Sequence, residues 1–89
     1  MKYAIHYQNL LKHPNWAKKR VEILNRDDFQ CRNCGSKKNL RVHHRQYHVD
    51  IRTRLMKNPW EYNNKYLITL CDVCHVAGHS RFQVPVFSI

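Results

Sequence analysis

The sequence predicts a small α+β domain held together by a metal ion, and three observations lead to that prediction. Segment 16–27 repeats its apolar residues at helical spacing. Segments 40–44 and 66–70 are short and carry β-branched residues, as short strands do. The four cysteines of the 89 residues form two C-x-x-C pairs, a spacing typical of metal sites.

The first element is an amphipathic helix from Trp16 to about Asp27. Pro14 and Asn15 give the start signal, with Asn15 as the expected N-cap. Lysine and arginine residues occupy one face of this helix. The apolar face is expected to consist of Ala17, Val21 and Leu24, flanked by Trp16 and Ile23.

The rest of the chain alternates strands with connecting segments. We expect a strand over 40–44 and a second over 66–70, which leads into the second cysteine pair. Between them, 50–58 is expected to form a short basic helix that ends at Asn58-Pro59. Asp72 is the expected N-cap of a last helix running to about residue 81.

The length fits one domain over 1–89, with the motifs concentrated at about 16–81. A domain of this size buries only about 60–65% of its unfolded surface, so other cross-links must assist hydrophobic burial. With 43% apolar residues the chain is too hydrophobic for a disordered basic tail. It shows neither a membrane-spanning run nor a signal-peptide core. We therefore expect a cytoplasmic protein without a membrane partner.

The composition is strongly basic. Sixteen Lys and Arg stand against six Asp and Glu, giving a formal net charge of +10. This charge indicates a polyanionic partner, although an acidic membrane surface, an acidic protein or a merely solubilising surface remain open on charge alone. The basic residues alternate with aromatic ones, which favours a folded nucleic-acid-binding face. We expect its contacts to come from Arg41, Arg45, Arg52, Arg54 and Lys57.

The cysteine pairs predict a closed structural zinc site made by Cys31, Cys34, Cys71 and Cys74. Without a secretory signal, an even number of cysteines favours metal over disulfides. A C-x-x-C turn places two thiolates about 3.5–4 Å apart, as one edge of a tetrahedral zinc site requires. Two disulfides or a redox pair are the alternatives.

Four of the seven histidines lie beside these elements. His43 and His44 end the first expected strand, whereas His75 and His79 are four residues apart on the last expected helix. An i, i+4 pair lies on one helix face with Cβ atoms about 6 Å apart, which suits two imidazoles on one metal. The spacing predicts a second, open metal site, with a pair of surface histidines as the alternative.

Four motifs together resemble the HNH endonuclease family. In order from Arg20 to His75 they are R-x-x-I-L-x-R-D-x-F-x-C-x-x-C-G, L-x-V-H-H, P-W-E-Y and L-I-T-L-C-x-x-C-H. The resemblance implies the ββα-metal (His-Me finger) fold, in which two antiparallel strands and a helix surround one catalytic divalent ion. It also implies hydrolysis of phosphodiester bonds, and we expect DNA rather than RNA as the substrate.

The resemblance further implies roles for individual residues. His44 matches the general base that activates water. Tyr66 stands where the family usually has its middle Asn, so Asn63 or Asn64 is expected to support the site instead. The other three of the four grouped histidines match ligands of the catalytic metal. They are His43, His75 and His79, and His79 matches the second helical ligand of the colicin-type variant.

An imidazole shell favours Zn²⁺, Ni²⁺, Co²⁺ or Mn²⁺ over Mg²⁺, which prefers oxygen ligands, although all five ions are candidates. Two other functions remain open, a non-catalytic zinc-knuckle module that binds nucleic acid and a ribonuclease. The four grouped histidines favour the nuclease, because a module that only binds has no need of them.

Overall fold

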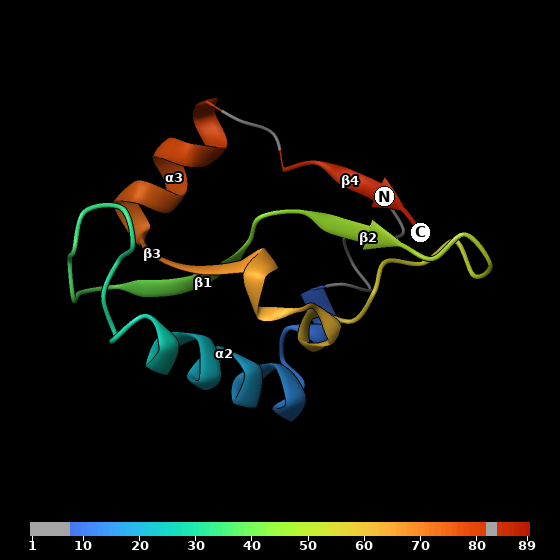
Figure 1. Cartoon of the computed structure of the whole chain (residues 1–89), viewed down its shortest axis with the longest axis horizontal. Helices are drawn as coiled ribbons and strands as arrows, with labels where there is room; N and C mark the ends of the chain where they lie inside the picture. The colour runs from blue at the N-terminus through green and yellow to red at the C-terminus, as the bar shows by residue number, and fades with distance from the viewer. Residues whose placement is uncertain (1–7, 82–83) are drawn as a thin grey trace.

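Two short sheets organise the computed structural model, which describes residues 8–81 and 84–89, with side chains for 8–78 and 84–89 (Figure 1). The elements are α2 (Pro14–Arg26), β1 (Leu40–His44), β2 (Tyr47–Val49), β3 (Leu67–Cys71), α3 (Asp72–Arg81) and β4 (Val86–Ser88). The first sheet pairs β1 with β3 in antiparallel fashion, and the second pairs β2 with β4 in parallel. Two 3₁₀ turns, η1 (Pro59–Glu61) and η2 (Asn64–Tyr66), precede β3. The predicted α+β class is confirmed.

The N-cap of the helix α2 lies two residues earlier than predicted. His13 is the N-cap, because its Nδ1 accepts a hydrogen bond from the Asn15 backbone N–H at 3.0 Å. Pro14 fits the first turn, where no backbone N–H is needed. The predicted apolar face is wrong, because Trp16 and Ile23 are the buried residues of this helix. Of the expected face, Ala17 and Val21 are exposed and Leu24 is only half-buried.

The strands β1 and β3 form an antiparallel pair that positions the histidines. We call this pair the β1–β3 hairpin, although β2 and the two 3₁₀ turns lie between its strands in the chain. Leu40 pairs with Cys71 at one end and His44 pairs with Leu67 at the other. The first strand spans the predicted residues, and the second lies one residue later than predicted. The helix α3 follows β3 directly, and its first residue, Asp72, donates its backbone N–H to the Asn39 carbonyl at 3.0 Å. This bond extends the pairing of the hairpin into the start of α3.

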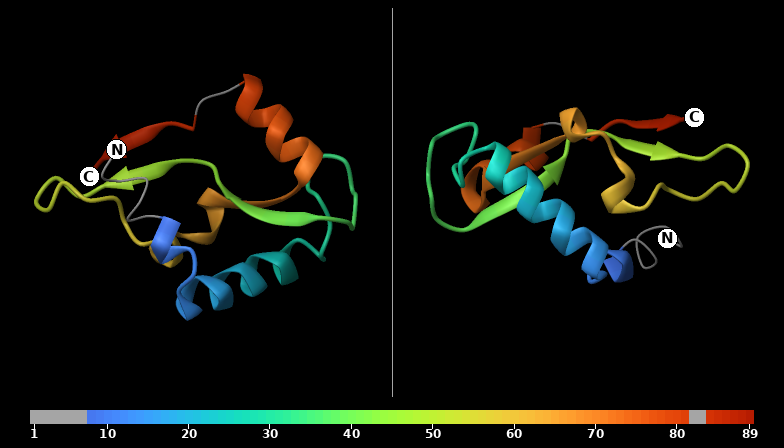
Figure 2. Two further views of the ribbon diagram at one scale, coloured as in Figure 1. Left: turned by 180° about the vertical axis from the view of Figure 1, so that it is seen from behind. Right: turned by 60° about the horizontal axis from the view of Figure 1, so that its bottom comes forward.

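The core lies between α2 and the β1–β3 hairpin. Its buried hydrophobic cluster consists of Trp16, Ile23, Tyr62 and Leu67. The helices α2 and α3 lie on opposite sides of the hairpin (Figures 1 and 2). A cluster this small leaves much of the stability to polar and metal cross-links.

A buried carboxylate, Asp27, connects three segments of the fold. It accepts hydrogen bonds from Arg26 Nε at 2.8 Å, Arg32 Nη1 at 2.8 Å and the Thr69 backbone N–H at 3.0 Å. Burial alone would raise the pKa of Asp27, but these donors outweigh it and hold the pKa well below its ordinary value. The end of α2, the first cysteine turn and β3 therefore share one charged anchor.

The structure contradicts the short helix predicted over 50–58. Residues 51–53 form a turn, and Val49 bridges Met56 in antiparallel fashion, so the chain reverses direction after β2. A helix of nine residues is marginal without packing, whereas reversal continues the backbone pairing of β2. The C-terminal strand β4, which was not predicted, covers the other edge of β2. Within the described ranges, no helix is long and apolar enough to cross a bilayer.

Candidate active site

The four cysteines converge as predicted. The sulfur atoms of Cys31, Cys34, Cys71 and Cys74 all lie within 4.8 Å of one another, and those of Cys34 and Cys71 are 3.6 Å apart. Zinc–sulfur bonds of about 2.3 Å in a tetrahedral shell put the sulfurs about 3.8 Å apart. The cluster is therefore positioned to hold a metal ion, and its donors and spacing fit zinc.

The backbone around Cys31 stabilises its thiolate form. Burial alone would raise the pKa of this thiol, but hydrogen bonds from the backbones of Cys34, Cys71 and Asn33 outweigh it and lower the pKa to about 6. Gly35 closes this turn at a positive φ of 80° and donates its N–H to the Cys31 carbonyl at 2.8 Å. A residue without Cβ adopts this backbone without strain, so the C-x-x-C-G turn presents its cysteines to a metal.

The same cluster fixes the start of α3. Cys71 is the last residue of β3, and Cys74 lies in the first turn of α3. His75 follows Cys74 directly, so its position depends on the cysteine cluster. A metal bound there would hold the helix that carries His75 against the hairpin.

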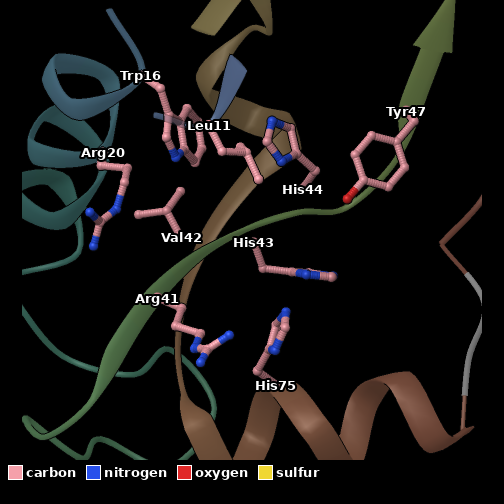
Figure 3. A pocket seen from close by; sticks show the side chains of 9 residues that line it. All are labelled: Leu11, Trp16, Arg20, Arg41, Val42, His43, His44, Tyr47 and His75. Carbon is pink, nitrogen blue, oxygen red and sulfur yellow. The ribbon is translucent and has the colours of Figure 1, made fainter. Parts of the chain in front are cut away.

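Three of the four predicted site histidines lie around one pocket (Figure 3). The pocket has a volume of about 400 Å³ and receives residues from α2, β1, β2 and α3. His79 lies in α3, but its side chain is outside the described part of the chain. The lining residues are Leu11, Trp16, Arg20, Arg41, Val42, His43, His44, Tyr47 and His75.

The two adjacent histidines of β1 point to opposite sides of the strand (Figure 3). His44, like Val42, projects toward α2, whereas His43, like Arg41, projects toward α3. This alternation is the geometry of a regular strand. The pocket therefore contacts both faces of the end of β1, with one histidine on each.

The imidazoles of His43 and His75 lie side by side. Their ring centroids are 5.0 Å apart, and the ring planes meet at 77°. Two imidazoles on one ion, with metal–nitrogen bonds of about 2.1 Å and a tetrahedral angle, have centroids roughly 5 Å apart. The spacing of the two rings is that of two ligands of one metal ion, and it is also that of an edge-to-face contact between two rings.

His44 is buried, with 3% of its surface exposed, and its tautomer is fixed. Its Nε2 lies 3.1 Å from the Pro59 carbonyl oxygen. A carbonyl only accepts, so Nε2 donates, and in the neutral ring Nδ1 carries the lone pair. Burial lowers the pKa of His44 to about 4 in spite of the Pro59 hydrogen bond. The ring is therefore neutral at pH 7.

Aromatic rings surround His44 on several sides. Trp16 and Tyr47 stack on it, with centroid distances of 5.1 and 5.3 Å, and Tyr62 meets it edge-on at 4.9 Å. The Tyr62 hydroxyl also accepts the His48 backbone N–H at 3.0 Å. These contacts fix the orientation of the His44 ring.

Two arginines add positive charge to the pocket. Arg41 contacts Asp72 of α3 through its Nε, 2.5 Å from Oδ1, and its side chain is 60% exposed. Arg20 comes from α2 and was not predicted as a site residue. Its position one helical turn after Trp16 could have predicted this, because residues four apart lie on the same face of a helix. Of the other predicted contacts, Arg45, Arg52 and Arg54 are exposed and Lys57 is half-buried.

The two asparagines that the resemblance led us to expect as supporting residues have other contacts. Asn63 Oδ1 accepts the Lys65 backbone N–H at 3.1 Å and caps η2. Asn64 Oδ1 accepts from Lys19 Nζ. The backbone group that contacts the His44 ring belongs to Pro59, in the P-W-E-Y segment. Every residue has a backbone carbonyl, so the identity of the residue at position 59 did not predict this contact.

No family model, curated protein or solved structure matches this chain.

Proposed function

We propose that this chain is a metal-dependent HNH endonuclease of the ββα-metal type that hydrolyses phosphodiester bonds in DNA. One observation carries the proposal. His44, with Nε2 bound to Pro59, lies in the same pocket as the His43–His75 pair and two arginines. The antiparallel β1–β3 hairpin followed directly by α3 supports it.

A divalent metal would be held by His43 and His75, with His79 as the expected third ligand. Two or three imidazoles leave coordination positions for water and phosphate, as a catalytic site requires. When bound, the ion supplies positive charge to a phosphate oxygen and to the leaving oxygen. The cysteine cluster would hold a separate, structural zinc ion.

His44 is the general base in this proposal. Its Nδ1 accepts a proton from the attacking water, while Nε2 continues to donate to Pro59. A pKa of about 4 makes an imidazole a weak base at neutral pH. A phosphodiester anion in the pocket favours the protonated ring, whereas the divalent ion and the two arginines of the same pocket disfavour it. The faces of Trp16 and Tyr47 also favour a cation between them.

Arg20 and Arg41 bind the phosphate. Guanidinium groups match two phosphate oxygens at once through their paired N–H groups. Asp72 contacts Nε of Arg41, which orients the guanidinium beside α3. Such contacts position the backbone of the nucleic acid without selecting a base sequence.

A plasmid-nicking assay with His44→Gln tests the proposal. The Gln amide retains a donor for the Pro59 carbonyl but offers no basic nitrogen, so we expect cleavage to fall by about 10²–10⁴-fold with little change in melting temperature. His48→Gln is the matched control, because His48 lies outside the lining of this pocket. Each protein is assayed with Mn²⁺, Ni²⁺, Zn²⁺ and Mg²⁺. Wild-type cleavage by His44→Gln would disprove the role of His44.

The burial of His44 favours a second candidate, a zinc-knuckle module that binds nucleic acid without cleaving it. In that case His44 is a packing residue whose polar nitrogen is satisfied by Pro59. The same assay separates the candidates, since a binding module retards DNA but cleaves it with none of the metals. Cleavage of RNA in preference to DNA would indicate a ribonuclease.

A further inference from the structure

The strand β2 and the turn that follows it form a projecting arm, which we define as residues 47–57 and call the β2 arm. Figures 1 and 2 show its turn extending beyond the rest of the described ribbon at one end of the long axis. Val49 bridges Met56, and the Asp50 backbone N–H donates to the Leu55 carbonyl at 2.9 Å. Backbone pairing therefore gives this arm a defined shape.

The tip of the arm combines positive charge with exposed aliphatic groups. Arg52 and Arg54 are both exposed. Ile51 is 65% exposed and Leu55 is 49% exposed. The acidic residue of the arm, Asp50, is engaged in the turn, where its Oδ1 accepts the Arg52 backbone N–H at 2.7 Å. The tip thus presents two cations and two apolar side chains together.

The turn at the tip holds the backbone of Arg54 in a defined conformation. Its φ is 60°, in the left-handed region that favours glycine or asparagine. Its backbone N–H donates to the Asp50 carbonyl at 2.7 Å and closes the turn. Arg52 and Arg54 therefore lie together on one ordered turn.

We infer that the β2 arm enters the minor groove of duplex DNA, with Arg52 and Arg54 in the groove and Ile51 or Leu55 against a base step. The minor groove is about 6 Å wide, and A·T-rich tracts narrow it further and attract arginine. Proteins that bind this groove combine arginine with aliphatic wedges between base pairs. A membrane surface fits less well, because stable membrane binding needs a larger apolar face. The inference rests on the proposed function, since it names how the DNA substrate is bound.

The position of the arm predicts where this contact falls. Tyr47 lines the pocket and begins the arm, and Arg52 is five residues further on, in the turn at the tip. Five residues span at most about 17 Å when fully extended as a strand, which equals about five base pairs at 3.4 Å each. We therefore expect the groove contact within about five base pairs of the cleaved bond.

The test compares R52Q/R54Q with K37Q/K38Q, which removes the same charge from another exposed loop. Binding is measured in the His44→Gln background, which prevents cleavage, with an A·T-rich duplex of about 25 base pairs in about 0.15 M salt. We expect R52Q/R54Q to bind at least about tenfold more weakly and to lose the preference for A·T-rich over G·C-rich duplex. A minor-groove ligand such as netropsin should displace the protein with the intact arm.

Equal affinity of R52Q/R54Q and K37Q/K38Q, or no displacement by netropsin, would overturn the inference. A second contrary result is that R52Q/R54Q weakens binding to phosphatidylserine vesicles but not to DNA. That result would identify a membrane surface as the partner instead. A second variant, I51N/L55N, should reduce DNA bending measured by energy transfer between the duplex ends.

The plasmid-nicking assay separates this inference from the proposed function. Groove binding without cleavage by any metal leaves the arm's role intact, whereas cleavage with unaltered binding by R52Q/R54Q removes only that role.

Discussion

The imidazole of His43 on β1 meets that of His75 on α3 edge-on, with ring centroids 5.0 Å apart. The two residues come from different elements, and the hairpin and the cysteine cluster bring those elements together. The contact between the two rings therefore depends on both supports.

The first prediction concerns this pair. His43→Ala and His75→Ala should each weaken Mn²⁺ or Ni²⁺ binding by about tenfold or more, because each removes one ligand of an incomplete shell. Calorimetric titration measures this affinity. The zinc content, measured by elemental analysis, should remain that of the wild type because the four cysteines are unchanged. Unaltered Mn²⁺ and Ni²⁺ affinity in both variants would contradict the two-imidazole site.

The second prediction concerns Cys31. Structural zinc contributes about 10–16 kcal/mol of apparent binding free energy in small domains, comparable to or greater than the total stability of about 5–15 kcal/mol. Cys31→Ser should therefore abolish cooperative thermal unfolding, and a strong chelator should do the same to the wild type until zinc is restored. Ser36→Ala, in the same loop, is the control that should retain zinc. A zinc-free Cys31→Ser protein with wild-type melting would show that the cluster is not a structural site.

The third prediction concerns Asp27. Asp27→Asn should lower the free energy of unfolding by about 3 kcal/mol at pH 7, because it leaves the guanidinium groups of Arg26 and Arg32 and the buried Thr69 N–H without a charged acceptor. Asp28→Asn changes an exposed neighbour and should have little effect. Urea titration of both variants measures the difference.

The contribution of Asp27 also depends on pH in a defined direction. Its pKa is lowered in the folded protein, so the folded state binds fewer protons than the unfolded state at acidic pH. The stability is fully present above the ordinary pKa of 3.8 and is lost as the pH falls below it. The difference between wild type and Asp27→Asn should therefore be constant from pH 7 to 5 and shrink toward pH 3. A difference that grows on acidification would contradict the assigned ionic contacts.

The fourth prediction concerns Tyr62, which packs against His44 and follows η1. Tyr62→Phe keeps the ring but removes the acceptor for the His48 backbone N–H. We expect a loss of about 1 kcal/mol in stability and slower cleavage, because the segment that carries the Pro59 carbonyl is less firmly held. Tyr66→Phe is a control on the neighbouring 3₁₀ turn. Equal kcat for wild type and Tyr62→Phe would limit Tyr62 to a packing role.

Local patterns in the sequence predicted most of the elements near the site. Short-range spacing gave the α2 helix, the β1 strand, the β3 strand to within one residue and the four-cysteine cluster. The buried face of α2 was mispredicted, because Ala17 and Val21 fit a helical apolar stripe as well as Trp16 and Ile23 do. Which stripe packs inward depends on the large rings of Trp16 and Tyr62 meeting across the core.

The sequence also failed where the outcome depended on distant backbone. Segment 50–58 has the composition of a short helix but continues β2 into a turn, whose other edge is covered by β4. Pairing of β2 with residues almost forty positions later has no local signature. The same reason explains why β4 was not predicted.

The sequence by itself determined the chemical inventory of this protein, since spacing fixed the two cysteine turns and placed His43, His44 and His75 at the ends of elements. Only the tertiary structure decided how those groups face one another. Strand alternation put His43 and His44 on opposite sides of β1, and the Pro59 carbonyl selected which His44 nitrogen carries the proton. Such choices arise from contacts between residues distant in sequence. Residue identity limits those contacts, but packing and backbone pairing select among them.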